Sequence, residues 1–256
     1  MAWRRPLFDE RHRRYPHWMA AKKSRRQYIT AVTLPEDWVV PLSAPQLNKA
    51  NKHFADKWVG MWSDILWLAE EFAASQPGSV EATRAWHHLL MAVGNFKRSA
   101  GNIAPAPLPP PRNVQAPHQL TIPGLNGNVL DRGDPDTWRQ LKEIPGLGQG
   151  VPTASTVLSA LWPGNHVIID RRVVASAIGL NWGGSAPAGS SLPHRTWTLY
   201  EKYRSVVLAA AKRTGRQPVE VERALYVLDA RVMAGLKGSW SWRDYEATLN
   251  TVINGL

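Results

Sequence analysis

The stretch Leu141–Ala177 reads LKEIPGLGQGVPTASTVLSALWPGNHVIIDRRVVASA, and its pattern decides how we interpret the rest of the chain. It predicts a short helix, a proline-glycine turn over residues 144–148 and a second helix that begins at Pro152 or Thr153. An extended apolar run, Val167–Ile169, follows and leads into a third helix. The predicted order is therefore helix, turn, helix, extended run and helix.

Two features of this stretch point to chemistry. Gly146 and Gly148 leave the backbone amides of the turn uncovered, beside the start of a helix. Such amides form an anion-binding site that suits a DNA phosphate. Asp170 stands directly before the third helix, where an aspartate most often serves only as a helix cap.

The spacing of these pieces resembles the helix-hairpin-helix superfamily of base-excision DNA glycosylases, and within it the bacterial branch similar to 8-oxoguanine DNA glycosylase. That family combines an apolar-P-G-apolar-G hairpin with a T-A-x-x-(V/I)-L helix and, about twenty residues on, an apolar-apolar-Asp sequence. The matching residues here are 144–148, 153–158 and 168–170, and residues 150–155 carry a similar G-V-P-T-A-S version of the turn.

The resemblance implies an all-α fold of the helix-hairpin-helix DNA glycosylase type, with two helical lobes and at most a few short strands. It also implies that Asp170 is the catalytic carboxylate, which stabilises the positive charge that develops on the deoxyribose. We expect DNA contacts from the hairpin and its flanks, namely Gly146, Leu147, Gly148, Gln149, Gly150, Thr153, Arg171 and Arg172. For at least one of the two arginines, ordinary surface charge is the better explanation.

The sequence departs from the bifunctional members of that family at Gly150. Those members carry a lysine two residues after the second hairpin glycine, and its amine attacks C1′ as a Schiff-base nucleophile. Gly150 has no amine, and Lys142 lies on the other side of the hairpin. The resemblance therefore implies a monofunctional enzyme, with water as the nucleophile and an abasic site as the product.

Composition and charge favour a nucleic-acid partner. The 256 residues carry a net charge of +11, and residues 1–26 alone hold nine Lys/Arg against two acidic residues, or +7. Basic residues interleaved with Trp3, Tyr15 and Trp18 suit phosphate contact and base stacking, but an arm packed on the body fits the pattern equally well. We expect double-stranded DNA as the partner and leave the role of this arm open.

The chain contains no cysteine, which excludes disulfides, zinc–thiolate sites and cysteine-ligated iron–sulfur clusters. We expect no metal site and no cofactor, with a monovalent cation at the hairpin carbonyls left open. No apolar run is long enough to span a membrane, and the basic N-terminus lacks the apolar segment of a secretory signal. We expect a monomeric, cytoplasmic protein.

Changes in composition divide the chain into four regions. We expect a basic arm at 1–42, a helical region at 43–100, a proline-rich connector at 101–135, and the catalytic region with the last helices at 136–256.

A glycosylase must flip its target base out of the duplex into a pocket with aromatic walls. Six aromatic residues are candidates by type, although each fits the core better: Trp162, Trp182, Trp197, Tyr200, Trp240 and Trp242.

Two alternatives stand beside a glycosylase that excises a damaged or modified base. One is a non-catalytic helix-hairpin-helix DNA-binding protein, which has no need of a carboxylate at position 170. The other is a glycosylase that acts on hypermodified phage DNA as a defence against phage. The sequence does not identify the excised base, so it does not separate host repair from phage defence.

Overall fold

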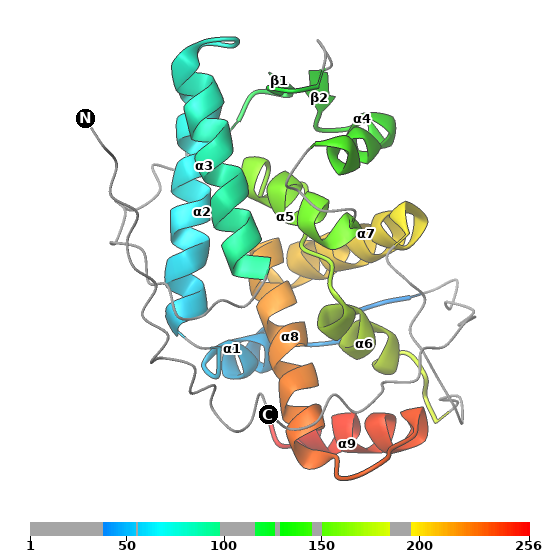
Figure 1. The fold of residues 1–256 in the computed structure, drawn as a ribbon. Coiled ribbons are helices and arrows are strands. Elements are labelled where there is room, and N and C mark those ends of the chain that lie inside the picture. Colours follow the sequence, from blue (N-terminus) through cyan, green and yellow to red (C-terminus); the bar gives the residue numbers. More distant parts are fainter. Residues whose placement is uncertain (1–37, 55, 98–115, 126–128, 145–149, 185–195) are drawn as a thin grey trace.

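The computed structural model describes residues 38–54, 56–97, 116–125, 129–144, 150–184 and 196–256, and these residues are mostly helical (Figure 1). In this part of the chain, nine α-helices surround a continuous hydrophobic core, and a single two-stranded sheet lies at one end. The predicted all-α class is confirmed. The basic arm lies outside the described residues, except for its last few positions.

Three helices make up the first part of the described chain: α1 (Ala44–Asn51), α2 (Asp56–Ala74) and α3 (Val80–Lys97). The apolar period over residues 46–74 predicts one helical stretch, with Gly60 as its expected point of division. The break instead follows α1, which begins with a capping box formed by Ser43 and Gln46. Helices α2 and α3 pack side by side as an antiparallel pair (Figure 1).

A small antiparallel sheet lies within the region predicted as a connector. It pairs β1 (Gln119–Thr121) with β2 (Val129–Asp131). Residues 122–127 imitate the hairpin motif, and the sequence predicts a loop there because no helix precedes them. Residues 126 and 127 lie outside the described part, and residues 122–125 form a turn: the Leu125 amide donates to the Ile122 carbonyl (3.2 Å), and Gly124 has a φ of 88°.

The next elements are α4 (Pro135–Gln140), the short 3-10 helix η2 (Leu141–Glu143) and α5 (Val151–Leu161). The sequence predicts Asp136 as the cap of a short helix over residues 138–143, and that prediction is wrong. Asp134 is the cap, because its backbone is extended and its carboxylate accepts from the Asp136 amide at 2.9 Å.

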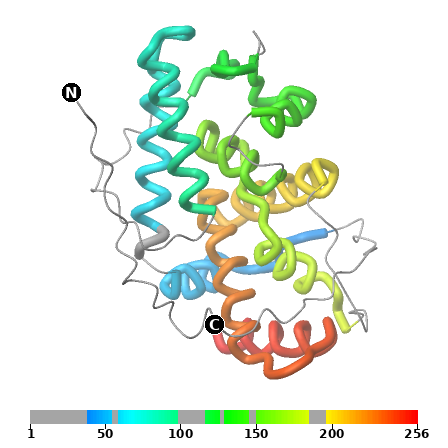
Figure 2. The backbone as a smooth tube through the Cα atoms, in the orientation of Figure 1, coloured from blue at the N-terminus to red at the C-terminus, as the bar shows by residue number. Residues whose placement is uncertain are grey.

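The last four helices are α6 (Arg171–Gly179), α7 (Trp197–Thr214), α8 (Pro218–Gly235) and α9 (Trp242–Asn254). Helix α8 is central, since it packs against α1, α6, α7 and α9 (Figure 2). Its apolar face is fully buried. A change on that face therefore affects contacts with several helices at once.

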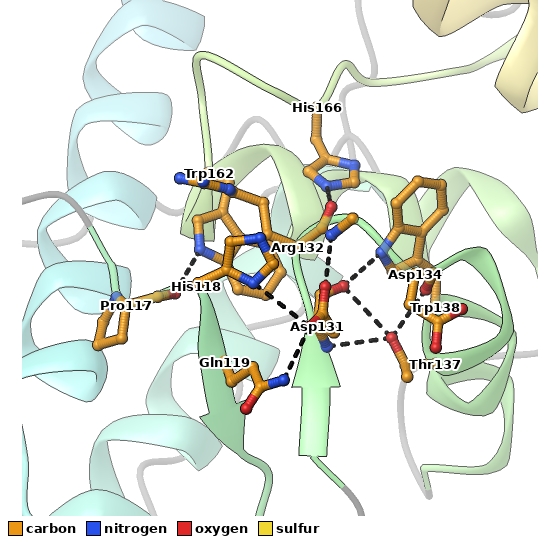
Figure 3. Close-up of polar contacts among 11 residues, drawn as sticks. Pro117, His118, Gln119, Asp131, Arg132, Asp134, Thr137, Trp138, Trp162 and His166 are labelled. Carbon is orange, nitrogen blue, oxygen red and sulfur yellow. Dashed lines mark hydrogen bonds and ion pairs between the residues drawn. The ribbon is translucent and has the colours of Figure 1, made fainter.

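His166 joins the sheet to the helices. Its Nε2 donates to the carbonyl of Arg132 (2.9 Å), and its Nδ1 accepts from the Tyr200 hydroxyl (2.9 Å). Two indole N–H groups extend the same connection: Trp138 donates to the Asp131 carbonyl (2.7 Å) and Trp162 to the Pro117 carbonyl (2.8 Å) (Figure 3).

The buried imidazole of His166 should make the protein sensitive to acid. Burial, with a smaller contribution from the charges of Arg204 and Arg132, lowers the pKa of His166 from 6.5 to about 3. Because the folded pKa lies below the unfolded value of 6.5, the stabilisation is present above pH 6.5 and is lost as the pH falls toward 3.

We expect His166→Gln to remove this acid sensitivity, because glutamine does not titrate. Between pH 7 and pH 4, the wild-type protein should lose about 3 kcal/mol more unfolding free energy than the variant. Urea unfolding at the two pH values measures the difference. Equal losses in both proteins would contradict a neutral, buried His166.

Candidate functional site

An extended segment, Val167–Ile169, leads to the first residue of the candidate site. It pairs with no strand among the described residues, so side chains satisfy its amides. The Ile169 amide donates to Oγ of Ser155 (3.1 Å), and the Ile168 amide donates to Oε1 of Glu222. Helices α5 and α8 thus fix the position at which the chain reaches Asp170.

Asp170 caps helix α6, as the simplest reading of its position predicted. Its Oδ1 accepts from the amides of Arg172 (2.7 Å) and Val173 (3.1 Å). Within the described part of the chain, both of its hydrogen bonds use this one oxygen. The side chain is half-buried and also lines a cavity. Capping the helix therefore uses Oδ1 alone, and Oδ2 is left to contact a bound molecule.

The cavity has a volume of about 350 Å³ and is open to solvent on one side. It lies where α2 and α3 meet α5, α6 and α8, with the segment around Asp170 as part of its wall. Small-molecule sites commonly have volumes of this order and form where two parts of a fold meet. The cavity is therefore large enough for a flat heterocycle.

Aromatic rings form much of the cavity wall. Phe54 and Tyr226 meet edge to face at 5.7 Å between ring centroids, and Trp62 and Phe96 lie 6.0 Å apart. The guanidinium of Arg223 lies 5.4 Å from the centre of the Phe54 ring. Such a wall suits stacking against a planar π-system.

The six aromatic residues named from the sequence do not line this cavity. Four of them are buried in the core: Trp162, Trp182, Tyr200 and Trp242. The other two, Trp197 and Trp240, are partly buried and pack against the core. The alternative that each is a core residue is therefore the correct one.

Four basic side chains line the cavity: Lys97, Arg171, Arg172 and Arg223. Arg172 is held in place, since its Nη1 donates to the Tyr226 hydroxyl (2.7 Å) and its Nε lies 3.9 Å from a carboxylate oxygen of buried Asp229. Arg171 is exposed. Of the two arginines predicted to contact DNA, Arg171 is thus better placed for a phosphate, and Arg172 supports the wall.

Glu222 is the one acidic lining residue, within the described part of the chain, that the sequence analysis did not predict. It is 4% exposed, and burial raises the pKa of its carboxyl well above the ordinary value; the nearby negative charge of Asp170 adds to the rise. A signal was present in the sequence. Glu222 stands directly beside the apolar stripe of Val221, Leu225 and Leu228, where a charged residue is unusual.

The remaining predicted site residues divide into two groups. Gly146, Leu147, Gly148 and Gln149 lie outside the described residues. Gly150 is the N-cap of α5, and Thr153 in the first turn of that helix lines the cavity together with Pro152.

The positions of the lysines bear on the predicted mechanism. A lysine amine near C1′ of a bound deoxyribose would act as a Schiff-base nucleophile in place of water. Lys142, which precedes the hairpin, is exposed, and neither it nor Lys202 lines the cavity. Lys97 at the end of α3 does line it. It is therefore the amine to consider in any test for a covalent intermediate.

In the described ranges, no three His, Cys, Asp or Glu side chains are grouped so as to hold a metal ion, and no helix is both long and apolar enough to cross a membrane. Comparison of the chain with protein-family models, curated proteins and solved structures found no match.

Proposed function

We propose that this protein is a monofunctional DNA glycosylase that flips a damaged or modified base out of double-stranded DNA and hydrolyses its N-glycosidic bond. The observation that carries the proposal is the position of Asp170. Its carboxylate lines an aromatic-walled cavity with a volume of about 350 Å³, at the end of the segment that the hairpin spacing singled out. A module that only binds DNA needs neither the cavity nor this carboxylate.

Asp170 suits the chemistry of the bond to be broken. As the C1′–N bond lengthens, positive charge develops on the deoxyribose, and a fixed carboxylate lowers the energy of that state. Two backbone amides hold the Asp170 carboxylate by one oxygen, so the charge is fixed in place before the substrate arrives. A water molecule at C1′ then serves as the nucleophile.

The basic lining of the cavity supports DNA as the substrate, and exposed Arg171 is its best-placed phosphate contact. Arg171→Ala should therefore reduce the slope of log affinity against log salt concentration by about 0.9, the value for one phosphate contact. Fluorescence anisotropy with a duplex at several salt concentrations measures this slope. Lys237→Ala, which removes an exposed charge beyond the end of α8, is the matched control. If Arg171→Ala, Lys237→Ala and the wild-type protein all had the same slope, Arg171 would lie outside the interface with DNA.

The chemical form of the product tests whether the enzyme is monofunctional. Since Gly150 has no amine, the expected product is an intact abasic strand, with no protein–DNA adduct after borohydride treatment. An adduct that disappears in Lys97→Met would identify Lys97 as the nucleophile and replace the water mechanism. An adduct that persists in this variant would assign the nucleophile to another amine, with Lys142 and Lys202 among the candidates.

A further inference from the structure

Glu222 holds a special position in the candidate site. It lines the same cavity as Asp170, and its Oε1 accepts from the amide of Ile168, two residues before Asp170. Its other oxygen, Oε2, is buried and has no hydrogen-bond partner within the described part of the chain. Buried polar atoms without a partner are rare in folded proteins, and each requires an explanation.

The groups that face Glu222 show which charge state it holds. They are Lys97 on α3, Asp170 before α6, Arg223 on α8, and the buried tyrosines Tyr200 and Tyr203 on α7. Burial is the largest influence and favours the neutral acid, while the two cations and the Ile168 amide oppose it. Because Oε1 accepts from the Ile168 amide, Oε2 is the oxygen on which a neutral Glu222 holds its proton.

Two carboxyl groups with different surroundings thus share one cavity. Asp170 is half-buried and its carboxylate accepts two amide hydrogen bonds, whereas Glu222 is buried, and burial raises the pKa of its carboxyl well above the ordinary value. Two carboxyl groups with different surroundings are the arrangement that enzymes use to supply an acid and an anion at the same pH. In a C1′–N bond that breaks into a base and a sugar cation, one carboxyl group can therefore act on the base and the other on the sugar.

We propose that Glu222 is the general acid that protonates the departing base while Asp170 stabilises the sugar, an assignment that rests on the proposed glycosylase function. The C1′–N bond breaks, its electron pair goes to the base, and the proton on Oε2 of Glu222 passes to the base. The oxygen of a water molecule bonds to C1′, and the proton that it loses returns to the Glu222 carboxylate. The products are the free base and an abasic sugar with a hydroxyl at C1′.

This assignment narrows the class of substrate. A base that already carries a positive charge, such as 7-methylguanine, leaves without help from an acid. A neutral base is a poor leaving group until it is protonated, and general acid catalysis is worth roughly 10²–10⁴-fold in such steps. We therefore expect the protein to act on a neutral base with a protonatable nitrogen or oxygen.

The test compares Glu222→Gln with the wild-type protein in single-turnover base release from about pH 5 to about pH 9. Glutamine retains the acceptor for the Ile168 amide and donates a hydrogen bond, but it transfers no proton. We expect a loss of about 10²-fold or more at neutral pH, with duplex affinity and melting temperature unchanged. The wild-type rate should fall as the pH rises, and the variant should lack that fall.

Two further variants give the comparison its controls. Glu222→Asp keeps an acid in the cavity and should recover part of the rate that Glu222→Gln loses. Glu246→Gln alters another buried glutamate that accepts a backbone amide, from Gly184 at 2.5 Å, outside the cavity, and should leave the rate within about twofold.

Each remaining outcome decides the question. A Glu222→Gln protein that keeps its rate and its pH dependence would reduce Glu222 to a support for Ile168 and overturn the assignment, while leaving the glycosylase proposal intact. Failure of the wild-type protein to release any base would instead reject the glycosylase proposal itself, and the acid role with it. These two failures are distinguished before any variant is measured.

Discussion

Asp170→Asn is expected to reduce the rate of base release by about 10²-fold or more while leaving duplex affinity unchanged or higher. The loss is on the scale of removing one preorganised electrostatic contact from a transition state. Affinity should survive, because a carboxylate beside phosphates repels them and its removal ends that repulsion. Single-turnover kinetics and fluorescence anisotropy on the same duplex separate the two effects.

The asparagine variant suits this test because it retains the helix cap. Its Oδ1 can still accept from the amides of Arg172 and Val173, so stability should change little. Asp170→Ala loses the cap as well and should cost about 1 kcal/mol of stability in addition. Full activity in Asp170→Asn would mean that Asp170 serves only as a cap of α6.

Trp138→Ala is expected to destabilise the protein by about 3–5 kcal/mol, the range for removing a large aromatic side chain from a core. Trp138 is 1% exposed, meets the His166 ring edge to face at 4.7 Å and donates to the Asp131 carbonyl. Its loss would leave a cavity at the junction of the sheet, α4 and α7. A total stability of 5–15 kcal/mol is usual, so the loss is a large fraction.

Thermal unfolding measures this effect, and the melting temperature should fall by about 10 °C or more. Trp138→Phe is the matched control, because it keeps an aromatic ring in the core and removes the second ring of the indole together with its N–H. It should cost about 1–2 kcal/mol. If alanine and phenylalanine had equally small effects, Trp138 would not be the packing centre that its burial and its contact with the His166 ring indicate.

The parts of the candidate site that the sequence predicted are local. Asp170 follows an apolar run at a fixed distance from a proline-glycine turn, and Thr153 lies in the helix between them. Both positions depend on short-range patterns of turn and helix, which a sequence carries directly. The all-α class followed from the same patterns.

The parts that escaped prediction depend on the way distant helices pack. Phe54, Phe96 and Glu222 are far apart in the sequence and line one cavity with Asp170 only because the fold brings α3, α8 and the segment between α1 and α2 together. Nothing local distinguishes an aromatic residue in a cavity wall from one in the core. The six aromatic candidates therefore did not identify the wall of the cavity, and each of them belongs to the core or packs against it. Glu222 was the exception, because a glutamate beside an apolar helical stripe is itself a signal.

Smaller errors have local physical causes. Asp134 and Asp136 are both plausible caps, and Pro135 decides between them because proline favours the first helical position. The break after α1 carries neither proline nor glycine, so the apolar period continued across it. Strands of three residues, as in β1 and β2, are too short for a clear alternation.

The most direct test of the account is mass-spectrometric detection of free bases released from DNA by the purified protein. The panel should include oxidised, alkylated, deaminated and phage-modified duplexes, so that repair and defence substrates are both present. The account predicts that at least one duplex loses a base, that its strand is left with an intact abasic site, and that Asp170→Asn does this at least about 10²-fold more slowly. No release from any duplex, in a protein that is folded and binds DNA, would contradict it.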